Sequence, residues 1–111
     1  MANFRPVEHL SRAVSYMACS SDSPLKRLRT AYSVYLVPRY TRGWPQELQG
    51  SLDALNEAMY EGINTDASAM KIIARIVALY GEAERLYQQE LLKERISQFP
   101  QRVNNEKDYI Q

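Results

Sequence analysis

The feature that most constrains this chain is the stretch from Thr65 to Phe99, which contains no proline until Pro100. Apolar residues recur along it in two adjacent rows at steps of three and four, which is the helical period. One row is Met70, Ile73, Val77, Tyr80, Tyr87 and Leu91, and the other is Ala69, Ile72, Ile76, Leu79, Ala83 and Leu86. A helix of this extent is roughly 50 Å long, whereas a small domain is about 30 Å across. We therefore expect the helix to extend beyond the domain or to carry a second subunit.

Three shorter helices are predicted before this stretch. The first runs from Pro6 to about Cys19, and the second opens at the N-cap residue Ser23 and ends before Pro38. The third runs from Trp44–Pro45 to about Tyr60. Residues 37–43 between the second and third helices are expected to form a loop. The short connections predict an all-α, up-and-down bundle of about four helices with a long C-terminal helix. Residues 1–99 form a single helical domain in this prediction, and residues 100–111 form a polar C-terminal tail.

Gly81 lies in the middle of the predicted long helix, where it costs about 1 kcal/mol relative to alanine. Together with Ala74 and Ala78 it forms a ridge of small residues on one side of the helix. Such a ridge indicates either the close approach of a neighbouring helix or a kink.

Composition argues for a soluble protein. The chain has 111 residues, a formal net charge of +1 and a single cysteine, Cys19, so it cannot form an internal disulfide. No signal-peptide core or membrane-length apolar run is apparent, because Lys71, Arg75 and Glu82 interrupt the best candidate. We expect a cytoplasmic protein of bacterial or phage type with no membrane partner.

Catalytic and metal-binding residues are sparse. His9 is the only histidine, and Cys19 lies near a predicted helix C-terminus, which is not where reactive cysteines usually lie. Glu57 and Glu61 share a helix face but lack the histidines of a bundle metal site, and no glycine-rich phosphate loop is present. The sequence therefore predicts no catalytic residues, metal, cofactor or small-molecule substrate, and hence a protein that is not an enzyme.

Charge is unevenly distributed along the chain. Residues 1–43 contain seven Lys and Arg against two acids, and residues 44–90 contain eight acids against three bases. The basic side chains of the second helix and its following loop are Lys26, Arg27, Arg29, Arg39 and Arg42, with Tyr32, Tyr35 and Tyr40 between them. Cations interleaved with aromatic rings are typical of nucleic-acid binding. The competing interpretation is that these cations pair with acids, such as Glu47, Asp53, Glu57 and Glu61 of the third helix, within one chain or between subunits.

The far end of the long helix is a second candidate surface. Three short helices cannot cover its whole length, so its last apolar residues are expected to be exposed and to bind a partner. We predict that a second copy or a larger protein contacts Leu86, Leu91, Leu92, Arg95, Ile96 and Phe99. Burial of these residues beneath the N-terminal segment is the competing interpretation.

The segment WPQELQGSLDAL resembles parts of small uncharacterised helical proteins of bacteria and their mobile elements. In those proteins a short helix that begins with such a turn precedes a longer helix. The resemblance covers about a quarter of the chain and implies no activity. The predicted function is a non-enzymatic interaction or regulatory protein, such as a phage or mobile-element inhibitor or adaptor, and the alternative is a small nucleic-acid-binding protein.

Overall fold

The computed structural model is all-α, as predicted, with no strand in the described part of the chain. It describes the backbone of residues 3–110 and the side chains of residues 3–96. The helices are α1 (Arg5–Cys19), α2 (Pro24–Ala31), the π-helical turn η1 (Tyr32–Leu36), α3 (Pro38–Thr41), α4 (Gln46–Glu61) and α5 (Asp66–Ile110).

Local capping interactions explain where these helices begin and end. The Ser23 hydroxyl accepts a hydrogen bond from the Lys26 backbone N–H at 3.3 Å, and the Thr65 hydroxyl accepts one from the Ser68 N–H at 3.1 Å. Gly62 ends α4 with a φ of 93°, a conformation that residues with a side chain rarely adopt. The predicted N-cap role of Ser23 is therefore confirmed, while Thr65 and Gly62 mark the start of α5 and the end of α4.

The segment between α2 and α4 differs from the prediction. The second helix reaches Leu36 as predicted, but its last turn is the π-helix η1 and not a regular α-helical turn. The expected loop at residues 37–43 contains the short helix α3, which begins at Pro38. Proline is well suited to the first position of a helix because its fixed φ matches the helical value and its missing N–H has no partner there. The prediction of a simple loop was therefore wrong.

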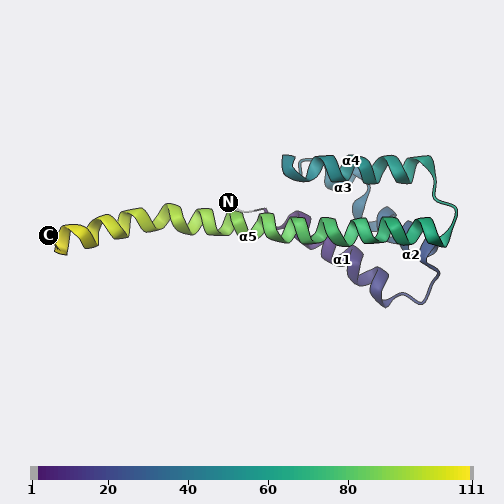
Figure 1. Cartoon of the computed structure of the whole chain (residues 1–111), viewed down its shortest axis with the longest axis horizontal. Helices are drawn as coiled ribbons and strands as arrows, with labels where there is room; N and C mark the ends of the chain where they lie inside the picture. The colour runs from purple at the N-terminus through teal and green to yellow at the C-terminus, as the bar shows by residue number, and fades with distance from the viewer. Residues whose placement is uncertain (1–2, 111) are drawn as a thin grey trace.

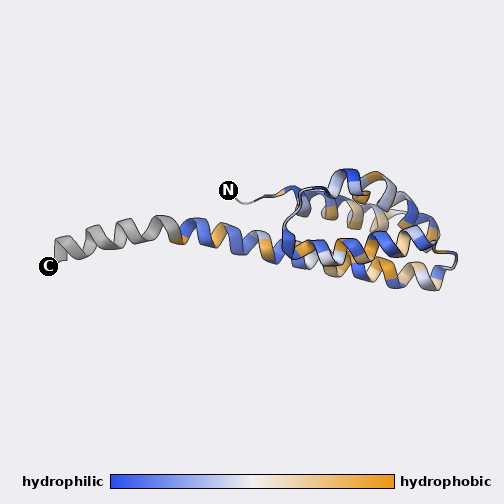
Figure 2. Ribbon diagram, turned by 90° about the horizontal axis from the view of Figure 1, so that it is seen from above, coloured by the Kyte–Doolittle hydropathy of each residue, from blue (hydrophilic) through white to orange (hydrophobic). Residues whose placement is uncertain are grey.

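The hydrophobic core is formed by α1, α2, η1, α4 and the first half of α5. Its largest fully buried side chains are Leu10, Leu28, Leu36, Leu48, Leu52 and Ile76. Figure 2 shows hydrophobic segments concentrated in this bundle and spaced more widely along the coloured part of α5 that extends beyond it. Of the two predicted apolar rows on α5, only the row containing Ala69, Ile76 and Ala83 is buried. Met70 and Val77, from the other row, are half-exposed, so the buried stripe is narrower than predicted.

Helix α5 is far longer than the bundle that it helps to form. It has 45 residues, and the molecule measures 69 × 25 × 20 Å, so α5 determines the long dimension. Figure 1 shows α5 passing in front of α1 and α2 and continuing alone toward the C-terminus. The helix does not end at Phe99 as predicted but runs through Pro100 to Ile110. A proline inside a helix removes one hydrogen bond and favours a kink, yet helical backbone can continue beyond it.

Candidate interaction surface

Helix α5 has a core face and an exposed face on its opposite side. The core face carries Ala69, Ile72, Ile76, Leu79 and Ala83, all buried. With about 3.6 residues per turn, a second set of positions at steps of three and four lies on the far side of the helix. We name this set the outer face; its members are Ala74, Ala78, Gly81, Arg85, Gln88, Leu92 and Ile96, and all are exposed.

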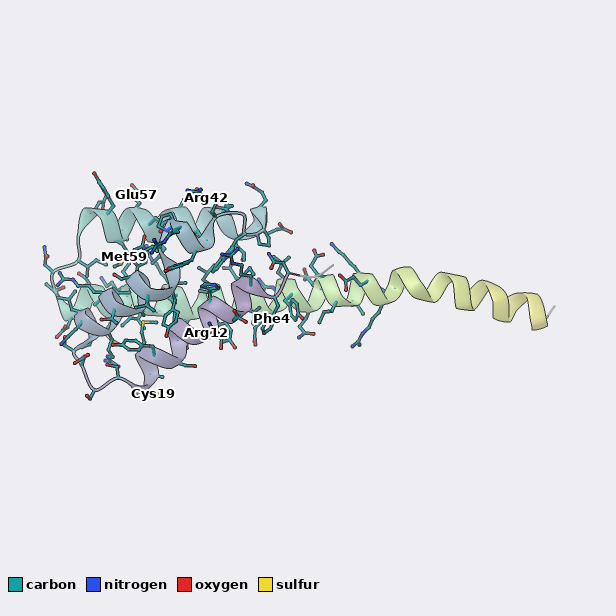
Figure 3. All side chains as sticks on the ribbon, turned by 180° about the vertical axis from the view of Figure 1, so that it is seen from behind. Phe4, Arg12, Cys19, Arg42, Glu57 and Met59 are labelled. Carbon is teal, nitrogen blue, oxygen red and sulfur yellow. The ribbon has the colours of Figure 1, made fainter. Side chains whose placement is uncertain are left out.

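The bundle contacts α5 as far as the residues around Glu90, and Leu91 and Glu94 beyond it are still half-buried. The ring of Phe4, just before α1, lies edge-on to the ring of Tyr87 with a centroid distance of 5.2 Å. Figure 3 shows Phe4 at the point where α5 leaves the bundle. Beside it, Asn3, Pro6 and Glu90 border a cavity of about 210 Å³. We name the part of α5 after Glu90 the overhang; its described side chains are those of residues 91–96.

The predicted partner-binding residues differ in their environments. Leu92 and Ile96 lie on the outer face with exposed fractions of 55% and 53%, and Arg95 beside them is also exposed. Leu91 is half-buried, and Leu86 is half-buried because it packs against the core of its own bundle. The side chain of Phe99 lies outside the described residues. The strongest candidates for a contact surface are therefore Leu92 and Ile96.

Two shallow grooves border α5 on either side of the outer face. On the α4 side, Ser51 and Ala54 face Arg75, Ala78 and Glu82 across a groove of about 300 Å³. On the α1 side, a smaller groove of about 160 Å³ lies between residues of α1 and the side chains of Met70, Ile73 and Val77. The bundle helices therefore flank α5 without covering its outer face.

Two of the predicted nucleic-acid-binding cations are used inside the fold. Arg27 donates a hydrogen bond from Nη1 to the Met17 carbonyl at 3.1 Å, at the C-terminal end of α1. Arg29 donates from Nη2 to the Ile63 carbonyl at 2.9 Å, in the loop between α4 and α5. Carbonyl groups at and beyond helix C-termini lack helical donors, and guanidinium groups satisfy them well. Arg27 and Arg29 thus stabilise the connections between helices.

The other three cations remain near the surface. Lys26 Nζ lies 3.8 Å from Asp22 of the preceding turn, in an exposed pair. Arg39 lies over the ring of Tyr40, with 5.0 Å from Cζ to the centroid, and Arg42 is exposed. Among the described side chains, no ion pair joins the predicted cations to acids of α4, so the expected pairing does not occur within the chain. The guanidinium groups of Arg27 and Arg29 have backbone carbonyls as partners instead.

The interleaved tyrosines are also engaged by the fold. The Tyr32 hydroxyl donates a hydrogen bond to Asn56 Oδ1 at 2.6 Å, which joins η1 to α4. Partial burial raises the pKa of Tyr32 above its ordinary value, because the phenolate would be poorly solvated there. Tyr32 and Tyr35 are half-buried and pack against the core, so their rings are not free platforms for bases.

His9 has a structural environment that the sequence did not reveal. Its ring is half-buried between the rings of Tyr40 and Trp44, with centroid distances of 5.7 and 6.0 Å. Nδ1 lies 3.1 Å from the Tyr35 carbonyl oxygen, and a carbonyl can only accept, so Nδ1 carries the proton. Within the described part of the chain, no group of three metal-ligating side chains occurs. Through its hydrogen bond to the Tyr35 carbonyl, His9 joins α1 to η1, and no sequence signal indicated this contact.

Comparison with protein-family models, curated proteins and solved structures finds no match for this chain. Among the described residues, no helix combines the length and the apolar character that crossing a membrane requires.

Proposed function

We propose that this chain is a non-enzymatic, cytoplasmic interaction protein that self-associates through the overhang of α5. In this proposal an up-and-down bundle of four principal helices serves as the support, and the long C-terminal helix carries the contact surface. The observation that carries the proposal is the exposure of Leu92 and Ile96 on a helix that has left its own bundle.

Exposure of this kind is unfavourable for an isolated chain. Burial of a leucine or isoleucine side chain gains about 1.5–3 kcal/mol relative to leaving it in water. Leu92 and Ile96 are one helical turn apart on the same side of α5, so one partner helix can cover both. Two such residues from each of two copies supply the centre of a small helix–helix contact.

The test compares two apolar residues of similar exposure. Leu92→Glu should shift the mass measured by light scattering from dimer or larger toward monomer. Val34→Glu is the matched control, because Val34 is 50% exposed but belongs to η1 in the bundle. A wild-type protein that stays monomeric at high concentration would contradict self-association. Docking of the same surface onto a larger protein, as by a phage or mobile-element inhibitor or adaptor, would then be the variant to pursue.

The alternative function, nucleic-acid binding, has weaker support. In the described part of the chain, the cations of this segment that make no bond to a backbone carbonyl are Lys26, Arg39 and Arg42, since Arg27 and Arg29 donate to such carbonyls. Binding through phosphates must weaken steeply as salt rises, because neutralised phosphates release counterions. A gel-shift series at low and high salt therefore separates the two functions. Absence of a shift at about 50 mM salt excludes this alternative.

A further inference from the structure

The outer face of α5 carries small residues at one end and large residues at the other. On the bundle part it carries Ala74, Ala78 and Gly81, and on the overhang it carries Leu92 and Ile96. A Cβ atom built on Gly81 would meet no other atom within 4 Å, so no part of the described chain lies against this residue. Gly81 therefore does not serve a close approach between helices of one bundle, and it leaves room for a helix from another molecule.

The charges beside the outer face repeat the same pattern on both flanks. Glu82 and Lys93 lie on one flank, and Glu84 and Arg95 lie on the other, because each pair is separated by about three helical turns. On each flank the acid nearest the end of the bundle precedes the base on the overhang, and Arg75 lies on the Glu82 flank two turns closer to the start of α5. No ion pair within the described residues involves these four side chains, although Glu84 Oε1 accepts a hydrogen bond from the Tyr80 hydroxyl at 3.0 Å.

We propose that the partner of the overhang is a second copy of this chain, bound antiparallel, with the two outer faces in contact and a two-fold axis between Gln88 and Gln89. This inference rests on the proposed function and specifies the partner and its orientation. In a two-fold antiparallel pair, each flank of one helix runs beside the same flank of the other in the opposite direction. Glu82 then faces Lys93 of the second copy, and Glu84 faces Arg95 of the second copy.

Size complementarity gives the same register independently. With the axis between Gln88 and Gln89, Ile96 is level with Gly81 of the second copy, and the missing side chain of Gly81 leaves space for it. Leu92 is level with Arg85 of the second copy, whose aliphatic stem can cover an apolar side chain. The overhang of each copy thus lies along the bundle part of the other copy's α5.

A parallel pair has the opposite electrostatic consequence. Two parallel helices with the same faces in contact bring unlike flanks together at the same height. Lys93 then approaches Arg95 of the second copy, and Glu82 approaches Glu84 of the second copy. Because these contacts join like charges, the charge pattern disfavours the parallel arrangement.

Charge reversal with rescue tests the orientation. The variant Lys93→Glu with Arg95→Glu should raise the dimer dissociation constant by roughly ten- to a hundredfold, because four attractive contacts become repulsive. Adding Glu82→Lys and Glu84→Lys should restore dissociation to within a few-fold of wild type, as measured by analytical ultracentrifugation. Arg42→Glu is the control, since Arg42 is exposed away from α5. Failure of the fourfold variant to recover, with helical content unchanged, overturns the antiparallel register.

Disulfide cross-linking is an independent test. In a Cys19→Ser background, Gly81→Cys combined with Ile96→Cys should give a covalent dimer on mild oxidation. Neither single cysteine should do so, because two copies of position 81 would lie about 22 Å apart along the axis. Efficient cross-linking by Gly81→Cys alone would overturn the proposal in favour of a parallel pair.

If Leu92→Glu abolishes association but neither orientation test succeeds, the proposed function stands and only this arrangement fails. A monomeric wild type contradicts both.

Discussion

Ile76 and Ile96 are the same residue type on the same helix, 20 residues apart, and their environments are opposite. Ile76 is completely buried on the core face of α5, whereas Ile96 is 53% exposed on the outer face of the overhang. Both belong to regular apolar spacing, and neither has a local feature that marks it as buried or exposed. The difference arises from what lies beside each position, since α1, α2 and α4 pack against one half of α5 and not against the other.

The bundle half and the overhang therefore contribute differently to stability. In the bundle half, the free energy of folding depends on packing within one chain. In the overhang, the free energy of burial becomes available only when another molecule arrives. Both halves use the same kinds of side chain, so the comparison can be tested with identical substitutions.

The largest expected difference is in the free energy of unfolding of Ile76→Ala and Ile96→Ala. We expect Ile76→Ala to lower the free energy of unfolding by about 2–5 kcal/mol, because it leaves a cavity in a packed core. Ile96→Ala should change it by less than about 0.5 kcal/mol, because the side chain is half in water already. Urea denaturation at a protein concentration low enough to populate the monomer measures both values. Equal losses from the two substitutions would show that the overhang is packed as tightly as the bundle.

A smaller effect is expected from two arginines of the basic segment. Arg29→Met should lower the free energy of unfolding by about 1–2 kcal/mol, because the Ile63 carbonyl loses a charged donor. Arg42→Met should leave stability within about 0.5 kcal/mol of wild type, because Arg42 is exposed and its side chain makes no hydrogen bond or ion pair within the described residues. Thermal unfolding compares the two variants directly. If both are equally stable and both weaken binding of a nucleic acid, the basic segment is a binding surface and the structural role assigned to Arg29 is wrong.

Much of the fold follows from features that are local in the sequence. The caps at Ser23 and Thr65 and the glycine at position 62 mark helix ends through local chemistry, and the cap at Ser23 was predicted from the sequence. The buried row on α5 was also predictable as one of two, but the choice between them depended on which side the other helices occupy. Met70 and Val77 were therefore misplaced.

The contacts that could not be predicted join residues far apart in the chain. Arg29 reaches a carbonyl 34 residues away, and His9 contacts a carbonyl 26 residues away. Neither partner residue has a side chain that marks its backbone carbonyl as an acceptor, so no sequence pattern indicated these contacts. The exposure of Leu92 and Ile96 followed from simple lengths, since three short helices cannot cover a long one. Their role as a binding surface stays a prediction.

The smallest expected effect is a change in how stability depends on pH when one of two tyrosines is replaced. Burial raises the pKa of Tyr32 above its ordinary value of about 10, so the unfolded chain loses this proton more readily than the folded chain. The stabilisation is complete below about pH 10 and is lost as the pH rises through the folded-state pKa. Tyr32→Phe should lower stability by about 1 kcal/mol at neutral pH by removing the bond to Asn56. Its deficit relative to wild type should shrink in strongly alkaline solution.

Tyr80 is the control that separates burial from hydrogen bonding. Its pKa is also raised, but chiefly because its hydroxyl donates to Glu84, with burial second. Since Tyr80 and Glu84 are near water, Tyr80→Phe should change the alkaline profile less than Tyr32→Phe does. Unfolding free energies measured from neutral to alkaline pH decide between them. If the loss of unfolding free energy in Tyr32→Phe stays constant across that range, the Tyr32 hydroxyl is not buried. Water would then reach the contact between η1 and α4 as it reaches the outer face of α5.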